Sequence, residues 1–547
     1  MSQMRRETSS KVAPVANVAL VALVALVGGV QWAAAQALEP IAYVIRIPDP
    51  ATHEIVVEAT MPATVSSSGS SSLDLMMPTW SPGYYRVEDY AANVREISAQ
   101  TIDGQPLVIE KTNGNHWKVD TRGQRAVKLS YRVFCNQRTV TTNYVDADYG
   151  VFNGAPTFIT LAEKNVRRPH DVRIELPAGW TAAMTGLDDG PGGKPNEFRA
   201  TDYEMLVDSP IVAGKLGIRT FEVADGGVSK KHFVVSAGDT DGWDGDRAAR
   251  DLKMFVEENQ RFWGFLPYEK YVFQLLFRPG GGGLEHRNSN LSTVVAKPRP
   301  RPDGTQVKWD GRWPSLGLQA HEYFHLYNVK RLRPIELGPF DFEKAPITGS
   351  LWISEGVTSY YSDLLMARAG LRTVDEHLAS LSSAIGSLQA SPGRRMQSVD
   401  RSSREVWENS NSGVNAKENT VSYYVKGNVM GLLLDAKIRR ATNGRASFDD
   451  VMRLAYRRYS GERGFTADEF RQTAEEIAGG GAGAGANISQ WFKSAVSSTD
   501  ELDYSDVLEW YGLRFVRTSP TAGAWTLERR PDQTAEQRER MEKWLGK

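Results

Sequence analysis

Two histidines four residues apart, with a glutamate directly after the first, are the strongest chemical signal in the sequence. They are His321, Glu322 and His325, in the stretch LGLQAHEYFHLYN. Residues four apart on a helix project from one face, so both imidazoles can reach one metal ion. Glu322 then lies where its carboxylate can take a proton from a water molecule held at that metal. The spacing predicts a zinc site that activates water, although by itself it also fits a helix with two surface histidines.

A third ligand is expected from a second helix. A catalytic zinc ion takes three protein ligands and keeps one position for water, and two histidines with one glutamate are a known set. Glu355 lies thirty residues after His325, in the segment LWISEGVTSYY. This segment is expected to be helical and to end near Gly370, because glycine favours helix C-termini. We therefore predict one zinc ion per chain, with Glu355 as its third protein ligand.

Two further motifs accompany the zinc segments. GGGLEHRNS, residues 281–289, precedes them, and SYYVKGNVMGLLLD, residues 422–435, follows them. Together, the four motifs resemble those of the glycyl aminopeptidase family of gluzincin metallopeptidases, and they occur in the same order. The resemblance implies a zinc peptidase with a thermolysin-like catalytic domain, packed behind an N-terminal β-sandwich.

The resemblance also implies roles for individual residues. Relatives hold the α-ammonium of the substrate with the glutamate of the glycine-rich motif, which is Glu285 in GGGLEHRNS. The tyrosine of the motif at residues 422–435, which is Tyr424, would donate a hydrogen bond to the oxyanion that forms when water attacks a peptide carbonyl. Gly282 and Gly283 would let the substrate backbone approach closely, although a glycine run alone also fits a flexible loop. With Glu322 as general base, the implied activity is removal of a small N-terminal residue, glycine or alanine, from peptides with a free N-terminus.

Two other functions stay open at this stage. A zinc endopeptidase of the same fold would need no carboxylate for the substrate amine. A non-catalytic peptide-binding protein on the same fold would need no general base, and the presence of Glu322 with a full ligand set argues against it. Activity on peptides with blocked N-termini, with and without a chelator, separates the three functions.

The first 37 residues have the features of a signal peptide. Arg5, Arg6 and Lys11 precede the nearly uncharged run Val15–Val30, and small residues follow it. We expect cleavage near residue 37, with a retained membrane anchor as the alternative. An exported protein, periplasmic or secreted from a Gram-negative bacterium, is then predicted, without stable membrane insertion after cleavage. Cys135 is the only cysteine, so no internal disulfide can form.

The length and composition predict an α+β multidomain protein. The chain has 547 residues, and 65 Lys and Arg balance 66 Asp and Glu. This balance gives no basic excess and therefore no indication of a nucleic-acid partner, while the oligomeric state is left open. We expect the following parts: signal peptide (1–37), N-terminal antiparallel β-sandwich (38–212), catalytic domain (213–440), helical C-terminal domain (441–512) and C-terminal tail (513–547).

Alternating apolar residues mark the expected strands. They cover Ile41–Ile47, Glu54–Thr60, Ala126–Phe134 and Asp171–Leu176. A polar loop is expected over Ser391–Thr420, next to the site. Relatives commonly carry a PDZ domain near the C-terminus, and the 513–547 tail is too short for a module with its own core. We expect a strand and an amphipathic helix there instead.

Overall fold

The computed structural model describes residues 38–63, 71–163, 167–297, 312–408, 419–480, 484–517 and 525–547. The predicted signal peptide lies outside the described residues, so it stays a prediction. Residues 39–547 form one unit by their contacts. The domain boundaries predicted at residues 212, 440 and 512 stay predictions as well.

Alternating burial builds the N-terminal sheets. In β8 (Ala126–Phe134), every second side chain is buried, as the period of two in a strand requires. This strand belongs to an eight-stranded sheet with the order β14 (Asp188–Asp189), β15 (Glu197–Ala200), β12 (His170–Glu175), β1 (Ile41–Arg46), β2 (Glu54–Pro62), β8, β4 (Val94–Thr101) and β5 (Pro106–Leu107). All neighbouring strands in it run antiparallel except β1 and β12, which are parallel.

Two four-stranded sheets complete the N-terminal β region. One has the order β13 (Ala182–Thr185), β16 (Ile211–Gly214), β10 (Tyr149–Phe152) and β9 (Tyr144–Val145). The other has the order β11 (Thr160–Leu161), β3 (Ser72–Met76), β7 (His116–Asp120) and β6 (Ile109–Lys111). Most of their buried side chains share one core with those of the large sheet. One face of the first of these sheets, with Tyr149, Val151 and Val212, instead packs against strands of the five-stranded sheet that follows. Cys135 is buried in the shared core, and burial raises the pKa of its thiol. The thiol therefore stays protonated, and Cys135 packs as a small apolar residue.

A mixed five-stranded sheet precedes the zinc motif. Its order is β17 (Gly217–Asp225), β18 (Val228–Gly238), β19 (Lys270–Phe277), β21 (Ser289–Val294) and β20 (Gly283–Glu285). The three central strands are parallel and the two edge strands antiparallel. Helix α3 (Gly245–Trp263) contacts β17 and ends at Gly264, which has φ +90° as a C-terminal glycine should.

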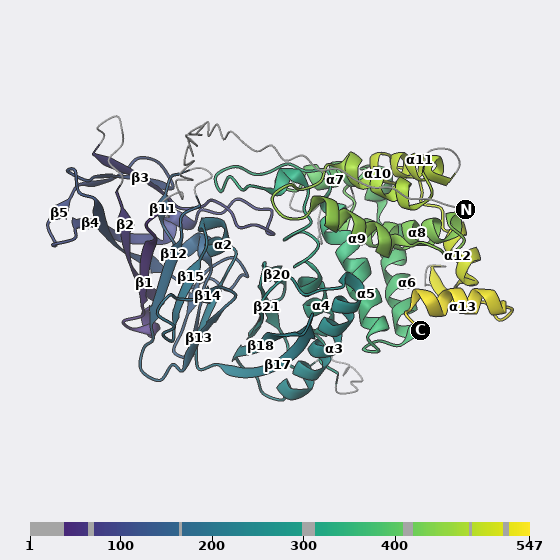
Figure 1. Ribbon diagram of the computed structural model, residues 1–547, viewed down its shortest axis with the longest axis horizontal. Helices are drawn as coiled ribbons and strands as arrows, with labels where there is room; N and C mark the ends of the chain where they lie inside the picture. Colours follow the sequence, from purple (N-terminus) through teal and green to yellow (C-terminus); the bar gives the residue numbers. More distant parts are fainter. Residues whose placement is uncertain are drawn as a thin grey trace, which may run out of the picture. The chain divides into compact units, whose positions relative to one another are not determined.

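Helices dominate the rest of the chain. Figure 1 shows strands gathered in the purple and blue part and helices in the green and yellow part, with β20, β21 and α4 between them in this view. The longer helices are α4 (Leu316–Phe324), α5 (Thr358–Arg368), α6 (Val374–Ala390), α7 (Val399–Arg404), α8 (Tyr423–Ala441), α9 (Phe448–Tyr459), α10 (Ala467–Ile477), α11 (Ala484–Ser497), α12 (Ser505–Tyr511) and α13 (Ala535–Trp544). Short helices α1 (Gly154–Thr157) and α2 (Tyr203–Val207) lie in the β region, and β22 (Leu513–Val516) pairs with β23 (Thr526–Arg529).

The predicted α+β fold is therefore confirmed, with local differences. Capping boxes begin α9 at Ser447 and α10 at Thr466, where Asp450 and Glu469 follow three residues later, a spacing typical of helix starts. The expected loop over Ser391–Thr420 instead contains α7 and a short 3-10 turn at Pro392–Arg395. The region after residue 512 holds β22, β23 and α13, which agrees with the predicted strand and terminal helix.

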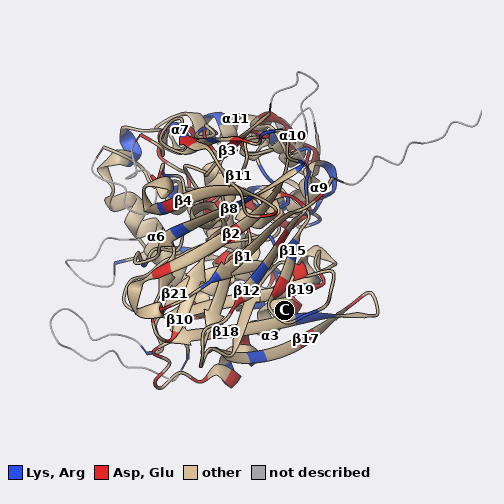
Figure 2. Ribbon diagram, turned by 90° about the vertical axis from the view of Figure 1, so that its left-hand side faces the viewer, with Lys and Arg blue, Asp and Glu red and all other residues tan. Residues whose placement is uncertain are grey.

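Charged residues of both signs are interspersed along the strands that face the viewer in Figure 2. Many of them form pairs on the sheet surface, such as Arg199 with Asp171 at 2.6 Å. Within the described ranges, no helix has both the length and the apolar character needed to cross a membrane.

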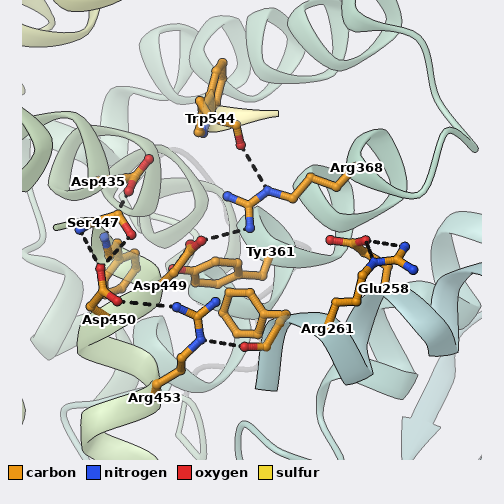
Figure 3. Close-up of polar contacts among 12 residues, drawn as sticks. Glu258, Arg261, Tyr361, Arg368, Asp435, Ser447, Asp449, Asp450, Arg453 and Trp544 are labelled. Carbon is orange, nitrogen blue, oxygen red and sulfur yellow. Dashed lines mark hydrogen bonds and ion pairs between the residues drawn. The ribbon is translucent and has the colours of Figure 1, made fainter. Parts of the chain in front are cut away.

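A buried polar network ties the C-terminal helix to α5 (Figure 3). Arg368 Nη1 donates to Asp449 Oδ2 at 2.8 Å, and Arg368 Nε donates to the Trp544 carbonyl at 3.0 Å. The Tyr361 hydroxyl donates to the other Asp449 oxygen at 3.2 Å. The Trp544 indole N–H donates to the Tyr360 hydroxyl at 3.0 Å. These contacts hold α5, and with it the segment that carries Glu355, against α9 and α13.

Replacing Arg368 with alanine should destabilise the protein strongly. The change leaves the Asp449 carboxylate buried without its cation, and breaking a buried pair from one side typically costs about 3–5 kcal/mol. The urea midpoint of unfolding should fall clearly below that of the wild type. Lys543→Ala is the matched control, because it removes an exposed pair with Glu539 on α13, and exposed pairs contribute little. Equal midpoints for the two variants would contradict a stabilising role of the network.

Candidate active site

The two histidines lie at the C-terminal end of α4. Helix α4 ends at Phe324, and His325 is its C-cap residue, with φ −60° and ψ −23°. These angles still belong to the right-handed helical region, so the four-residue spacing keeps both rings on one side. The Nε2 atoms of His321 and His325 are 3.0 Å apart.

Glu355 completes the set, and it does so from a π-helical turn. The expected regular helix is interrupted, because Trp352–Val357 (η4) forms a π-helical turn directly before α5. The Glu355 Oε2 atom lies 3.4 Å from His321 Nε2 and 3.1 Å from His325 Nε2. In a tetrahedral zinc site with bonds of about 2.1 Å, neighbouring ligand atoms are about 3.4 Å apart. The donor types and their separations therefore fit zinc.

Each imidazole has a second partner that turns its Nε2 toward the common centre. His325 Nδ1 donates to the Asn328 carbonyl at 2.9 Å, and His321 Nδ1 lies 3.4 Å from the Ser359 hydroxyl. Asn328 is itself fixed, since its side-chain amide donates to the Ile353 carbonyl at 2.8 Å. Such outer contacts set the tautomer and orientation of metal-binding histidines. Asn328 and Ser359 thus have positioning functions that spacing rules did not indicate.

The chain is strained directly after Asn328. Val329 has φ +129°, an unusual value for a β-branched residue. Through this turn, Lys330 N–H donates to the His325 carbonyl at 3.0 Å, and the Asn328 carbonyl faces the His325 ring. Strain of this kind persists only where the surroundings enforce it, and it is frequent at functional sites.

Buried carboxylates make this centre favourable for positive charge. Burial raises the pKa of Glu322, and the nearby Glu285 and Glu355 raise it further. Burial disfavours a charged His325, but the same carboxylates outweigh it and raise the pKa of the imidazole. Ligand atoms of Glu285, Glu322 and His325 all lie within 4.8 Å of one another. A divalent cation at the neighbouring set of His321, His325 and Glu355 would supply the charge that this environment favours.

Gly283 packs directly on the predicted general base. A Cβ built on Gly283 would lie 2.2 Å from Glu322 Oε1, so any larger residue would displace the carboxylate. Gly282 has φ +101° and no atom within 4 Å of such a Cβ. The predicted substrate contact of both glycines stays a prediction, but Gly283 has a second reason to be glycine.

Glu285 ends the edge strand β20 and is buried, with 4% of its surface exposed. Its Oε1 atom has no hydrogen-bond partner among the residues that the structure describes. The nearest cation is Lys330, whose Nζ is 4.0 Å from Oε1 but forms its short contact, 2.7 Å, with Asp208. Burial raises the pKa of Glu285, which reflects the incomplete compensation of its charge. A buried carboxylate oxygen without a partner is a candidate binding atom for a ligand.

Tyr424 lies in the first turn of α8, beside the zinc set. Its ring and that of His321 are 6.1 Å apart and nearly parallel, at 28°. Burial raises the pKa of its hydroxyl, and Glu355 raises it further, so the phenol keeps its proton for donation. Tyr423 is instead buried in the core, with 2% of its surface exposed. The structure thus brings Glu285, Glu322 and Tyr424 around the proposed metal ligands, and their roles stay predictions.

Comparison with known protein families gives two matches. A model described as the Peptidase M61 N-terminal domain matches residues 42–215, and one described as M61 glycyl aminopeptidase matches residues 315–430. Together they cover more than half of the chain. A search of curated proteins found no significant match.

Solved structures show the same fold. A protein of the aminopeptidase N family from Idiomarina loihiensis is 27% identical, with a TM-score of 0.77 over 88% of this chain and 80% of the other. A mutant M1 zinc metallopeptidase from Deinococcus radiodurans, bound to a Tyr-Ser-Ala substrate, is 16% identical, with a TM-score of 0.51 over 85% of this chain and 95% of the other. The second likeness concerns the fold alone.

Proposed function

From the premise that this chain belongs to the M61 glycyl aminopeptidase family and is a zinc metallopeptidase, we propose that it is an aminopeptidase. Its substrates are peptides with a free N-terminus and a small first residue, such as glycine or alanine. Peptides as a substrate class follow from the family. The preference for a free amine is the finer step, and it has its own support in the site.

The unpartnered oxygen of Glu285 is the observation that carries this proposal. A buried carboxylate oxygen that lacks a hydrogen bond is costly, unless a ligand supplies a donor. The α-ammonium of a peptide is a donor of matching charge, and the resulting charge-assisted hydrogen bond is strong. An endopeptidase has no use for such a group, because an internal peptide segment carries no ammonium there.

Zinc bound by His321, His325 and Glu355 would act as a Lewis acid that makes the attacking water more acidic and polarises the scissile carbonyl. Glu322 takes the proton from this water and delivers it to the leaving amine. Tyr424 donates a hydrogen bond to the oxyanion. Glu285 holds the α-ammonium, so that only the first peptide bond reaches the reacting atoms.

One assay separates the proposed function from its alternatives. The purified protein should hydrolyse glycyl and alanyl peptides with a free N-terminus much faster than their N-acetylated counterparts. A chelator should abolish this activity, zinc should restore it, and metal analysis should give one zinc ion per chain. Equal rates on free and acetylated peptides would support an endopeptidase, and zinc-loaded protein that hydrolyses neither would support a binding protein.

A further inference from the structure

A loop of the N-terminal β region lies directly against Glu285. The loop, residues 79–85, reads TWSPGYY and is called the Gly83 loop here. Gly83 has φ +92°, and a Cβ built on it would lie 2.5 Å from Oε1 and 2.8 Å from Oε2 of Glu285. The backbone of the β region therefore touches the carboxylate proposed to bind the substrate amine. Nothing in the motif spacing connects these two segments.

The Gly83 loop is held by the catalytic part of the chain. Thr79 N–H donates to the Phe342 carbonyl at 2.9 Å, and the Trp80 indole donates to the Asp341 carbonyl at 3.1 Å. The Trp80 ring meets that of Trp407 edge to face, with centroids 5.4 Å apart. Aromatic pairs in this arrangement add to the energy of burial. The loop is thus fixed in place and suited to shaping a site.

Tyr85 is the last residue of this loop and packs against the core of the catalytic part. Its ring packs edge to face on Trp407, with centroids 6.0 Å apart, and the side chain is half-buried. Burial raises the pKa of its hydroxyl, and the carboxylates of Glu355 and Glu285 raise it further.

The Gly83 loop borders the expected place of the first substrate residue. If Glu285 binds the α-ammonium and the scissile carbonyl reaches the centre that contains Glu355, the first residue spans the space between these carboxylates. Tyr85 follows Gly83, which touches Glu285, by two residues in the same loop. Two glycines thus approach this region from different segments. Gly283 of strand β20 packs on Glu322, and Gly83 of the N-terminal β region packs on Glu285.

On the basis of the aminopeptidase function proposed above, we propose that Tyr85 is a specificity-determining residue. Its ring contacts the side chain of the first substrate residue and restricts that residue to a small one. Gly83 occupies the space beyond Glu285. A peptide with a further residue on the N-terminal side of the bound one therefore has no room there. The small-residue preference would then come from the N-terminal β region and not from the zinc-binding helices.

The test is the ratio of kcat/KM for leucyl and glycyl p-nitroanilides. Tyr85→Ala should raise the leucyl-to-glycyl ratio about tenfold or more, because removing the ring opens space for an apolar side chain. Tyr85→Phe keeps the ring and should leave the ratio near that of the wild type. Tyr84→Ala is the matched control, since Tyr84 is the neighbouring tyrosine of the same loop and its backbone pairs with Ser81.

An unchanged ratio in Tyr85→Ala overturns the proposal, as does an equal rise in Tyr84→Ala, which would indicate general loosening of the loop. If Tyr85→Ala does not fold, Tyr85→Val serves the same comparison. Rates of the wild type on free and acetylated glycyl peptides are measured first. Equal rates there refute the aminopeptidase function itself, whereas a strong preference for the free amine with no effect of Tyr85 refutes only the role of this residue.

Discussion

Glutamine in place of Glu322 should lower kcat by about two to four orders of magnitude, which is the usual contribution of general acid–base catalysis. The amide has the size of the carboxylate, so its packing on Gly283 is retained, but it cannot accept the proton of the attacking water. Zinc should stay bound, because Glu322 is not among the three proposed ligands.

The measurement is kcat on an alanyl peptide together with zinc content of the same sample. His321→Ala is the contrasting variant, since it removes a proposed ligand and should lose both zinc and activity. Near-normal turnover in Glu322→Gln would assign the proton transfer to another group. Loss of zinc in that variant would instead make Glu322 a ligand and require a different arrangement of the site.

Alanine in place of Glu285 should lower kcat/KM on free N-termini by roughly two to three orders of magnitude. Leaving a buried charge unpaired costs about 2–5 kcal/mol, and each 1.4 kcal/mol corresponds to about a tenfold change. Zinc content should not change. The activity on N-acetylated peptides, small in the wild type, should not fall in parallel, so the preference for the free amine should disappear.

Comparison of one peptide in its free and acetylated forms decides this prediction. Glu269→Ala provides a control carboxylate, because Glu269 is exposed and pairs with Lys230 away from the proposed ligands. A Glu285→Ala enzyme that keeps the wild-type preference for the free amine would show that another group binds the ammonium. The aminopeptidase proposal would then need a different anchor.

Local patterns in the sequence predict those parts of the fold and site that depend on short-range spacing. The alternation in Ala126–Phe134 predicts β8 with its bounds, and Ser447 and Thr466 predict the starts of two helices. The four-residue spacing of His321 and His325 likewise keeps both rings on one side, although His325 is the C-cap residue of the helix. In each case, one helical turn or one strand determines the relevant geometry.

Contacts between distant segments could not be predicted in this way. The parallel pairing of β1 with β12 joins strands separated by more than a hundred residues, and no periodicity encodes it. The contact of Gly83 with Glu285 is of the same kind. Asn328 lies within the zinc motif, but its function depends on a turn at Val329 that the residue type does not suggest. Such features follow from packing of the whole chain, not from local propensity.

The π-helical turn at Trp352–Val357 has a consequence for insertions and deletions. A π-helical turn holds one residue more than an α-helical turn, so it corresponds to a single-residue insertion in a regular helix. Deleting Gly356 would restore regular winding and rotate Glu355 by roughly 100° relative to α5. The carboxylate would then point away from the two imidazoles, although every ligand would still be present in the sequence. In a homologue with an uninterrupted helix, the third metal ligand must come from a neighbouring position in the sequence. A sequence alignment of the two proteins that ignores the insertion would then pair Glu355 with the wrong residue.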